Sequence, residues 1–82
     1  MITSKTPLQE LFDIAIKTLP DVESEEVFTV RELFRGFEWN RIEKGNRTKL
    51  GSMFYAYAEG TGASQIKPLQ KTPQNQQLYK RL

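Results

Sequence analysis

The chain has 82 residues, a length that suits one small domain with a modest core. It contains neither cysteine nor histidine, which excludes disulfides, a serine–histidine–aspartate triad and zinc sites built on those ligands. We therefore expect a protein that is not an enzyme and holds no cofactor or metal. Because we find no signal peptide and no apolar run long enough to span a membrane, we expect a cytoplasmic protein that makes no membrane contact.

The net charge of +2 is distributed unevenly along the chain. Residues 1–26 carry two basic and six acidic side chains, whereas residues 27–82 carry ten basic and four acidic ones. The two parts therefore have net charges of −4 and +6. Such asymmetry is typical of a protein that directs one face at a polyanion. Chance clustering on a solvated surface is the alternative interpretation.

A loose arm over residues 1–5 and a helix over residues 6–19 are the first predicted elements. Thr6 and Pro7 suit a helix start, and Pro20 suits its end. The apolar residues of this segment recur at spacings of three and four, which places them on one face of the helix: Leu8, Leu11, Phe12, Ala15 and Leu19. An acidic connector over residues 21–26 follows, and β-branched and aromatic residues predict a short strand over residues 26–29.

Two further helices are predicted in the middle of the chain. Thr29 and Glu32 have the spacing of a capping box, which predicts a short helix over residues 30–35 that ends at Gly36. A connection over residues 37–45 leads to a longer helix over residues 46–59, with Asn46 as its cap.

The last segment, residues 64–82, has two interpretations. It forms either a β hairpin with Pro68 in an edge strand and Leu78 facing inward, or a mobile polar tail over residues 70–82. With the hairpin, the element order predicts a single, mainly α domain over residues 1–82, with the order of a winged helix-turn-helix.

Basic residues gather near the start of the longer predicted helix, where free backbone N–H groups favour phosphate, and along the predicted hairpin. Tyr55 lies off the core face of that helix and is the first candidate for stacking on bases, followed by Trp39 and Tyr79. Trp39, the only tryptophan, is either a core residue or a stacking platform. The candidate nucleic-acid contacts are Arg41, Lys44, Arg47, Lys49, Tyr55, Lys67, Lys71, Lys80 and Arg81.

A longer motif runs through the middle of the chain: LFRGFEWNRI at residues 33–42, then Gly45, Arg47, Leu50-Gly51 and Phe54. In these residues, and in Lys71-Thr72, Asn75-Gln76-Gln77 and Tyr79, the chain resembles a family of small domains of unknown function found on phages and mobile genetic elements of Gram-positive bacteria. The resemblance covers roughly residues 25–82. The chain is also similar to the single-stranded-DNA-binding proteins carried by staphylococcal cassette chromosome elements.

This resemblance implies a winged helix-turn-helix that binds single-stranded DNA cooperatively, with self-association on the DNA, during replication or transfer of a mobile element. It also implies an apolar pocket, which we map onto Phe37 and Trp39. A C-terminal tail with a separate role, contact with replication proteins, is implied as well.

Three functions remain as hypotheses. The first is a sequence-tolerant binder of single-stranded DNA, in which cations contact phosphates and aromatic side chains stack on bases. The second is a transcriptional regulator that reads duplex DNA with the longer helix. The third is a module that recruits replication enzymes through the Phe37–Trp39 pocket and the tail.

Overall fold

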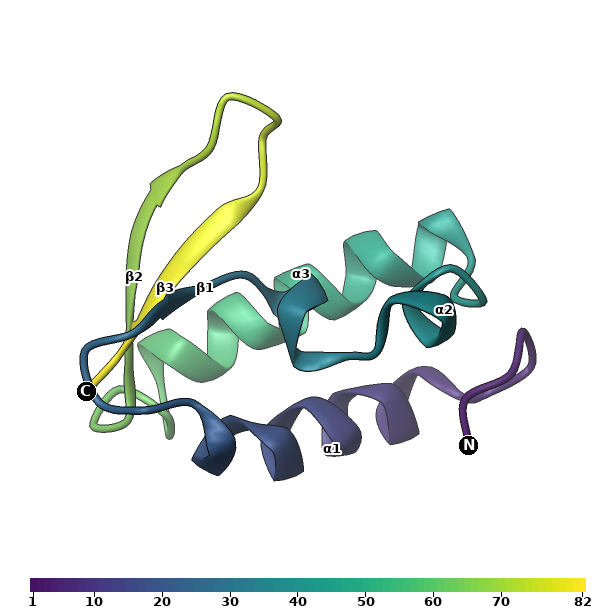
Figure 1. The fold of residues 1–82 in the computed structure, drawn as a ribbon, viewed down its shortest axis with the longest axis horizontal. Coiled ribbons are helices and arrows are strands. Elements are labelled where there is room, and N and C mark those ends of the chain that lie inside the picture. Colours follow the sequence, from purple (N-terminus) through teal and green to yellow (C-terminus); the bar gives the residue numbers. More distant parts are fainter.

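Two long helices and a three-stranded antiparallel sheet form the fold (Figure 1). The computed structural model describes all 82 residues. In chain order the elements are α1 (Leu8–Thr18), the 3-10 helix η1 (Leu19–Asp21), β1 (Val27–Phe28), the 3-10 helix η2 (Val30–Leu33), α2 (Gly36–Trp39), α3 (Lys44–Glu59), β2 (Ile66–Lys71) and β3 (Gln77–Arg81). None of these helices combines the length and the apolar character that a membrane-spanning helix needs.

The predicted winged helix-turn-helix is wrong: the chain is an α+β domain in which the sheet has three strands. The stretch expected to form the first helix of a helix-turn-helix pair makes only the four-residue η2. The backbone is then extended at Phe34 and Arg35, and Gly36 begins the single turn α2 instead of ending a helix. A capping box does form, because the Thr29 N–H donates to Glu32 Oε1 at 2.9 Å. The turn that it starts is too short to pair with α3 as the first helix of a helix-turn-helix.

The sheet has the order β1-β3-β2, so the last strand of the chain is its centre. Phe28 of β1 and Pro68 of β2 both lie opposite Tyr79 of β3. The structure thus contains the hairpin, and Pro68 lies in an edge strand, where its missing N–H costs no ladder bond. Tyr79 is fully buried, whereas Leu78, the residue predicted to face inward, is half-buried.

The core lies between α1, α3 and the inner face of the sheet. Helix α3 contributes Leu50, Phe54 and Ala58, which recur at spacings of four and are all buried. The Phe54 ring centroid lies 5.0 Å from that of Tyr79 and 6.4 Å from that of Phe28, both in edge-on packing. Phe54 therefore joins α3 to two strands at once.

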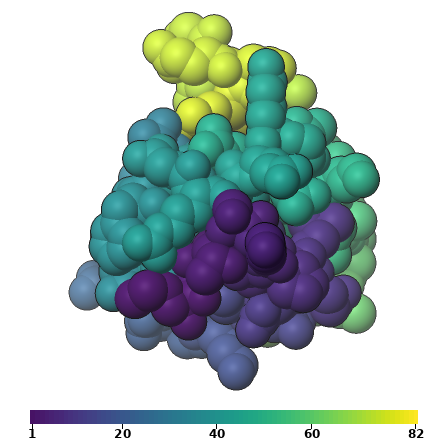
Figure 2. All heavy atoms as spheres, turned by 90° about the vertical axis from the view of Figure 1, so that its right-hand side faces the viewer, coloured from purple at the N-terminus to yellow at the C-terminus, as the bar shows by residue number.

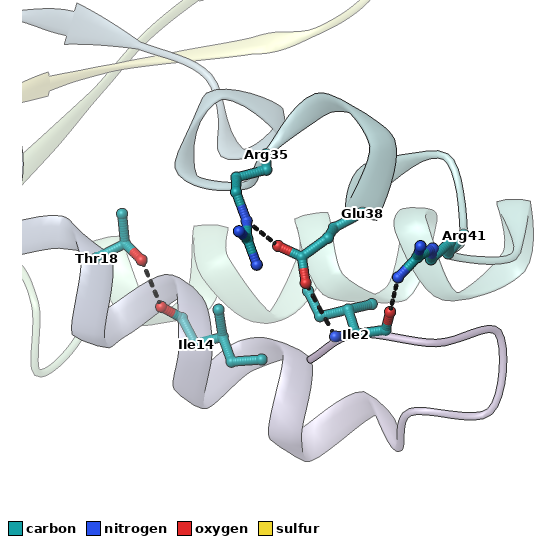
Figure 3. Close-up of polar contacts among 6 residues, drawn as sticks. All are labelled: Ile2, Ile14, Thr18, Arg35, Glu38 and Arg41. Atoms are coloured by element: carbon teal, nitrogen blue, oxygen red, sulfur yellow. Dashed lines mark hydrogen bonds and ion pairs between the residues drawn. The ribbon is translucent and has the colours of Figure 1, made fainter.

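The N-terminal arm is anchored, contrary to the loose arm that the sequence predicts. Ile2 is only 2% exposed, and its N–H donates to Glu38 Oε2 at 2.9 Å (Figure 3). Arg41 donates to the Ile2 carbonyl oxygen at 2.9 Å, and Arg35 Nε donates to Glu38 Oε1 at 2.6 Å. One buried carboxylate on α2 thus holds both an arginine and the backbone of the arm.

Glu38→Gln is expected to lower the thermal unfolding midpoint by a few degrees at neutral pH. The hydrogen bond from Arg35, and then that from the Ile2 backbone, lowers the pKa of Glu38 below its ordinary value of 4.5. A lowered pKa means that the ionised form stabilises the fold above pH 4.5, and that this contribution is lost as the pH falls through the folded-state value. The midpoints of wild type and variant should therefore converge in acid. Glu10→Gln, at an exposed residue of α1, is the matched control, and an equal loss there would contradict the assignment.

Candidate nucleic-acid interface

A groove of about 720 Å³ lies between one face of α3 and the β2–β3 hairpin. Helix α3 supplies a row at spacings of three and four, so that these side chains share one face of the helix. The hairpin supplies the opposite wall through its turn and both strands (Figure 1). The uncharged, non-aromatic lining residues are Thr29, Val30, Thr48, Gly51, Ser52, Asn75, Gln76 and Gln77.

All the charged side chains that line the groove are basic. Arg31, Arg47 and Lys71 line it, and no aspartate or glutamate does. The two ion pairs of the structure, Arg35–Glu38 and Lys80–Glu25, involve none of these three cations. A concave site lined by several basic side chains concentrates anions more strongly than a flat surface does. The groove is therefore suited to a polyanion.

Aromatic side chains lie among these cations. The guanidinium carbon of Arg47 sits 5.5 Å from the centroid of the Trp39 ring, a cation–π contact. The ring of Trp39 also packs on that of Phe34, at a centroid distance of 5.5 Å. Arg47 Nε is buried and has no hydrogen-bond partner in the chain. Tyr55, 39% exposed, presents a second aromatic ring to the groove.

Tyr79 reaches the groove from the centre of the sheet. Its side chain is buried, and its hydroxyl has no hydrogen-bond partner in the chain. Burial, with a smaller contribution from Tyr55, raises the pKa of Tyr79 to about 12. Buried hydroxyls without a partner are uncommon, because each forfeits the hydrogen bonds it made in water. This hydroxyl can donate a hydrogen bond to a molecule in the groove, or accept one from it.

Tyr79→Phe is expected to leave stability at neutral pH unchanged or slightly raised, since it removes a polar group that gains no bond on folding. The pKa of this phenol is about 10 in the unfolded chain and about 12 in the folded one. Its contribution to stability is therefore fully present below pH 10 and is lost as the pH rises toward 12. Urea denaturation at several alkaline pH values should show wild type losing stability relative to the variant. A constant difference would contradict the burial of the hydroxyl.

Five candidates predicted from the sequence meet in the groove: Arg47, Tyr55, Lys71, Trp39 and Tyr79. Arg31 was missed, because in the sequence it is one more charge on a short predicted helix. Its position two residues after the capping-box threonine is the only signal that could have indicated it.

The other sequence candidates lie outside the groove. Lys44 and Lys49 are exposed on other parts of α3, and Lys67 is exposed on β2. Lys80 forms an ion pair with Glu25 at 2.6 Å.

The last two candidates are held by backbone groups. Arg81 donates to the carbonyl oxygen of Gln65 at 3.0 Å. Arg41, which follows α2, donates to the carbonyl oxygen of Ile2, as described above.

The structure also separates the two residues assigned to an apolar pocket. Trp39 packs on Phe34 and borders the groove, whereas Phe37 is 49% exposed. Guanidinium carbons of Arg35 and Arg41 each lie 5.1 Å from the Phe37 ring centroid. The separation follows from helix geometry, because residues two apart on an α-helical turn point in nearly opposite directions.

A family model, described as a domain of unknown function (DUF1413), matches residues 13–81. This chain belongs to the DUF1413 family. Every residue that lines the groove falls within the matched range of the DUF1413 domain, whereas Ile2 and the rest of the N-terminal arm fall outside it. Searches of curated proteins and of solved structures returned no match.

Proposed function

We propose that this DUF1413 domain is a non-catalytic binder of single-stranded DNA, and that the strand occupies the groove between α3 and the hairpin. The observation that carries the proposal is the lining of that groove: three cations without ion-pair partners, exposed aromatic surface and no carboxylate. Cations along the backbone path and aromatic rings for the bases are the two elements that sequence-tolerant single-strand binders combine.

The concave shape favours a single strand over a duplex. A helix that reads duplex DNA enters the major groove, which is about 12 Å wide, and must therefore protrude from the protein. Here the polar face of α3, with Arg47, Thr48 and Ser52, lines a groove together with the hairpin and residues 29–31, so it does not protrude. A flexible strand with unstacked bases can enter such a site, whereas a duplex meets the hairpin first.

We further infer a role in replication or transfer of a mobile genetic element. Its support is the motif at residues 33–42, in which the chain resembles the single-stranded-DNA-binding protein of staphylococcal cassette chromosome elements. Within this motif, Trp39 borders the groove, and Glu38 and Arg41 bind the backbone of Ile2 in the N-terminal arm.

Fluorescence anisotropy with a labelled single-stranded oligonucleotide, and with the same sequence as duplex, tests the proposal at two salt concentrations. We expect tighter binding to the single strand and a steep loss of affinity as salt rises, because phosphate contacts release counterions. Equal or tighter binding to duplex would instead support a transcriptional regulator. Absence of binding to either would contradict a nucleic-acid function, and would direct attention to protein partners.

A further inference from the structure

The α3 wall of the groove has a gap in its row of side chains. Arg47, Gly51 and Tyr55 follow one another at spacings of four, so they form one row along the helix, and all three line the groove. Arg47 and Tyr55 carry long side chains, whereas Gly51 between them presents only backbone. The hairpin, which forms the opposite wall, projects from the rest of the molecule (Figures 1 and 2). The gap at Gly51 therefore faces the hairpin across the groove.

The packing of the chain does not require glycine at residue 51. A Cβ atom placed there would meet no atom within 4 Å outside the neighbouring helix backbone. Glycine inside a helix also destabilises it relative to alanine, because the unfolded chain gains conformational freedom. The missing side chain thus benefits neither the core nor the helix. What it leaves is space for a molecule in the groove to approach the backbone.

Buried polar groups without partners lie beside this gap. The Tyr79 hydroxyl lines the groove and has no hydrogen-bond partner in the chain. Tyr55 contributes to the raised pKa of Tyr79, about 12, which places this hydroxyl toward the Tyr55 end of the row. At the other end of the row, Arg47 Nε is also buried without a partner. A ligand in the gap would restore hydrogen bonds that both groups lost on folding.

From this combination we propose that the gap at Gly51 is a slot for one base of the bound strand. The base enters edge-first, lies on the bare backbone of Gly51 and forms a hydrogen bond with the Tyr79 hydroxyl, while Arg47 donates to an adjacent phosphate. A hydroxyl both donates and accepts, and every base has an acceptor on its pairing edge. The slot therefore takes any base, as a sequence-tolerant binder requires.

The slot rests on the proposed function and adds a reason for the preference for a single strand. The edge that meets Tyr79 is the edge that pairs with the other strand in a duplex. One base cannot make both contacts, so the slot admits an unpaired base and excludes a paired one. Gly51 and Tyr79 are therefore the residues that set the ratio of affinities for single strand and duplex.

Gly51→Ala and Tyr79→Phe test the slot, because each is expected to keep or raise the stability of the fold while it weakens binding. The methyl group of alanine fills space that the base occupies, and phenylalanine lacks the hydroxyl. In fluorescence anisotropy, Tyr79→Phe should bind labelled oligothymidylate about 5-fold more weakly than wild type, the usual contribution of one net hydrogen bond. Gly51→Ala should lose at least as much affinity. Urea denaturation should show no loss of stability in either variant.

Two controls make the same chemical changes outside the groove. Gly45→Ala fills another open glycine site on α3, and Tyr57→Phe removes the hydroxyl of a ring that packs on Phe12 and Phe54. Neither Gly45 nor Tyr57 lines the groove, so both control variants should bind oligothymidylate as wild type does.

An oligonucleotide of the same length in which every nucleotide lacks its base separates the slot from the phosphate contacts. Gly51→Ala and Tyr79→Phe should bind this abasic strand as tightly as wild type does, because no base is present to enter the slot. Their affinity for duplex should also be unchanged, so the ratio of affinities for single strand and duplex should fall in both.

The possible failures of the slot and of the proposed function are distinguishable. Wild-type affinity of both groove variants for oligothymidylate would overturn the slot and leave the proposed function standing. Equal losses on oligothymidylate and on the abasic strand would also overturn the slot, since the effect would not depend on a base. Absence of wild-type binding to either strand would contradict the proposed function, and the slot with it.

Discussion

Replacement of Arg31, Arg47 and Lys71 together by glutamine is expected to weaken binding of single-stranded DNA by about 100-fold at about 0.1 M salt. Each phosphate contact on a single strand contributes about 0.7 to the slope of log affinity against log salt, so three lost contacts should lower the slope by about 2. The measurement is anisotropy across a salt series. The three side chains make no ion pair, so the substitutions leave no buried carboxylate unpaired.

The control for this triple variant removes the same charge elsewhere. Lys5, Lys17 and Lys49 are exposed on the arm, on α1 and on a part of α3 outside the groove. Their replacement by glutamine should cost far less affinity, because only long-range attraction is lost and salt screens it. Equal losses in the two triple variants would show that binding follows net charge and not the groove.

Phe54→Ala is expected to lower the free energy of unfolding by about 3–5 kcal/mol. The Phe54 side chain is fully buried and contacts the rings of Phe28, Tyr57 and Tyr79, so its loss leaves a cavity where α3 meets the sheet. For a domain of this size such a loss is a large part of the total stability, which is commonly about 5–15 kcal/mol. Urea denaturation at neutral pH measures it.

Phe37→Ala makes the same chemical change at the surface. Phe37 is 49% exposed, and its ring contacts are the guanidinium groups of Arg35 and Arg41. We expect a change in unfolding free energy within about 1 kcal/mol, because an exposed site leaves no cavity. Similar losses for the two substitutions would contradict the core described above.

The two long helices could be predicted from the sequence because their apolar residues repeat with helical spacing. The short elements could not. Residues 30–35 carry helix signals, but the backbone is extended at Phe34, whose ring packs on that of Trp39. In β3 the sequence analysis predicts that Leu78 faces inward, but Tyr79 is the buried residue. An error of one residue is enough for this, since successive strand residues point to opposite faces of the sheet.

The sequence predicts several residues of the candidate site, but it does not predict how the fold brings them together. Arg47 and Tyr55 share a helix, so their common face follows from spacing alone. Lys71 and Arg31 join them only because the hairpin turn and η2 fold against that helix, a tertiary relation that periodicity cannot supply. The anchored arm was missed for the same reason: the partner of the Ile2 N–H lies on α2, far away in the sequence.

The central claim, that a single strand occupies the groove, is tested most directly by the fluorescence of Trp39, which is the only tryptophan and borders that groove. Titration with oligothymidylate should quench this emission to saturation, and added salt should reverse the quenching. The triple glutamine variant should require far more oligonucleotide for the same effect. Unchanged emission at concentrations where anisotropy shows the DNA fully bound would place the strand elsewhere on the surface and contradict the account.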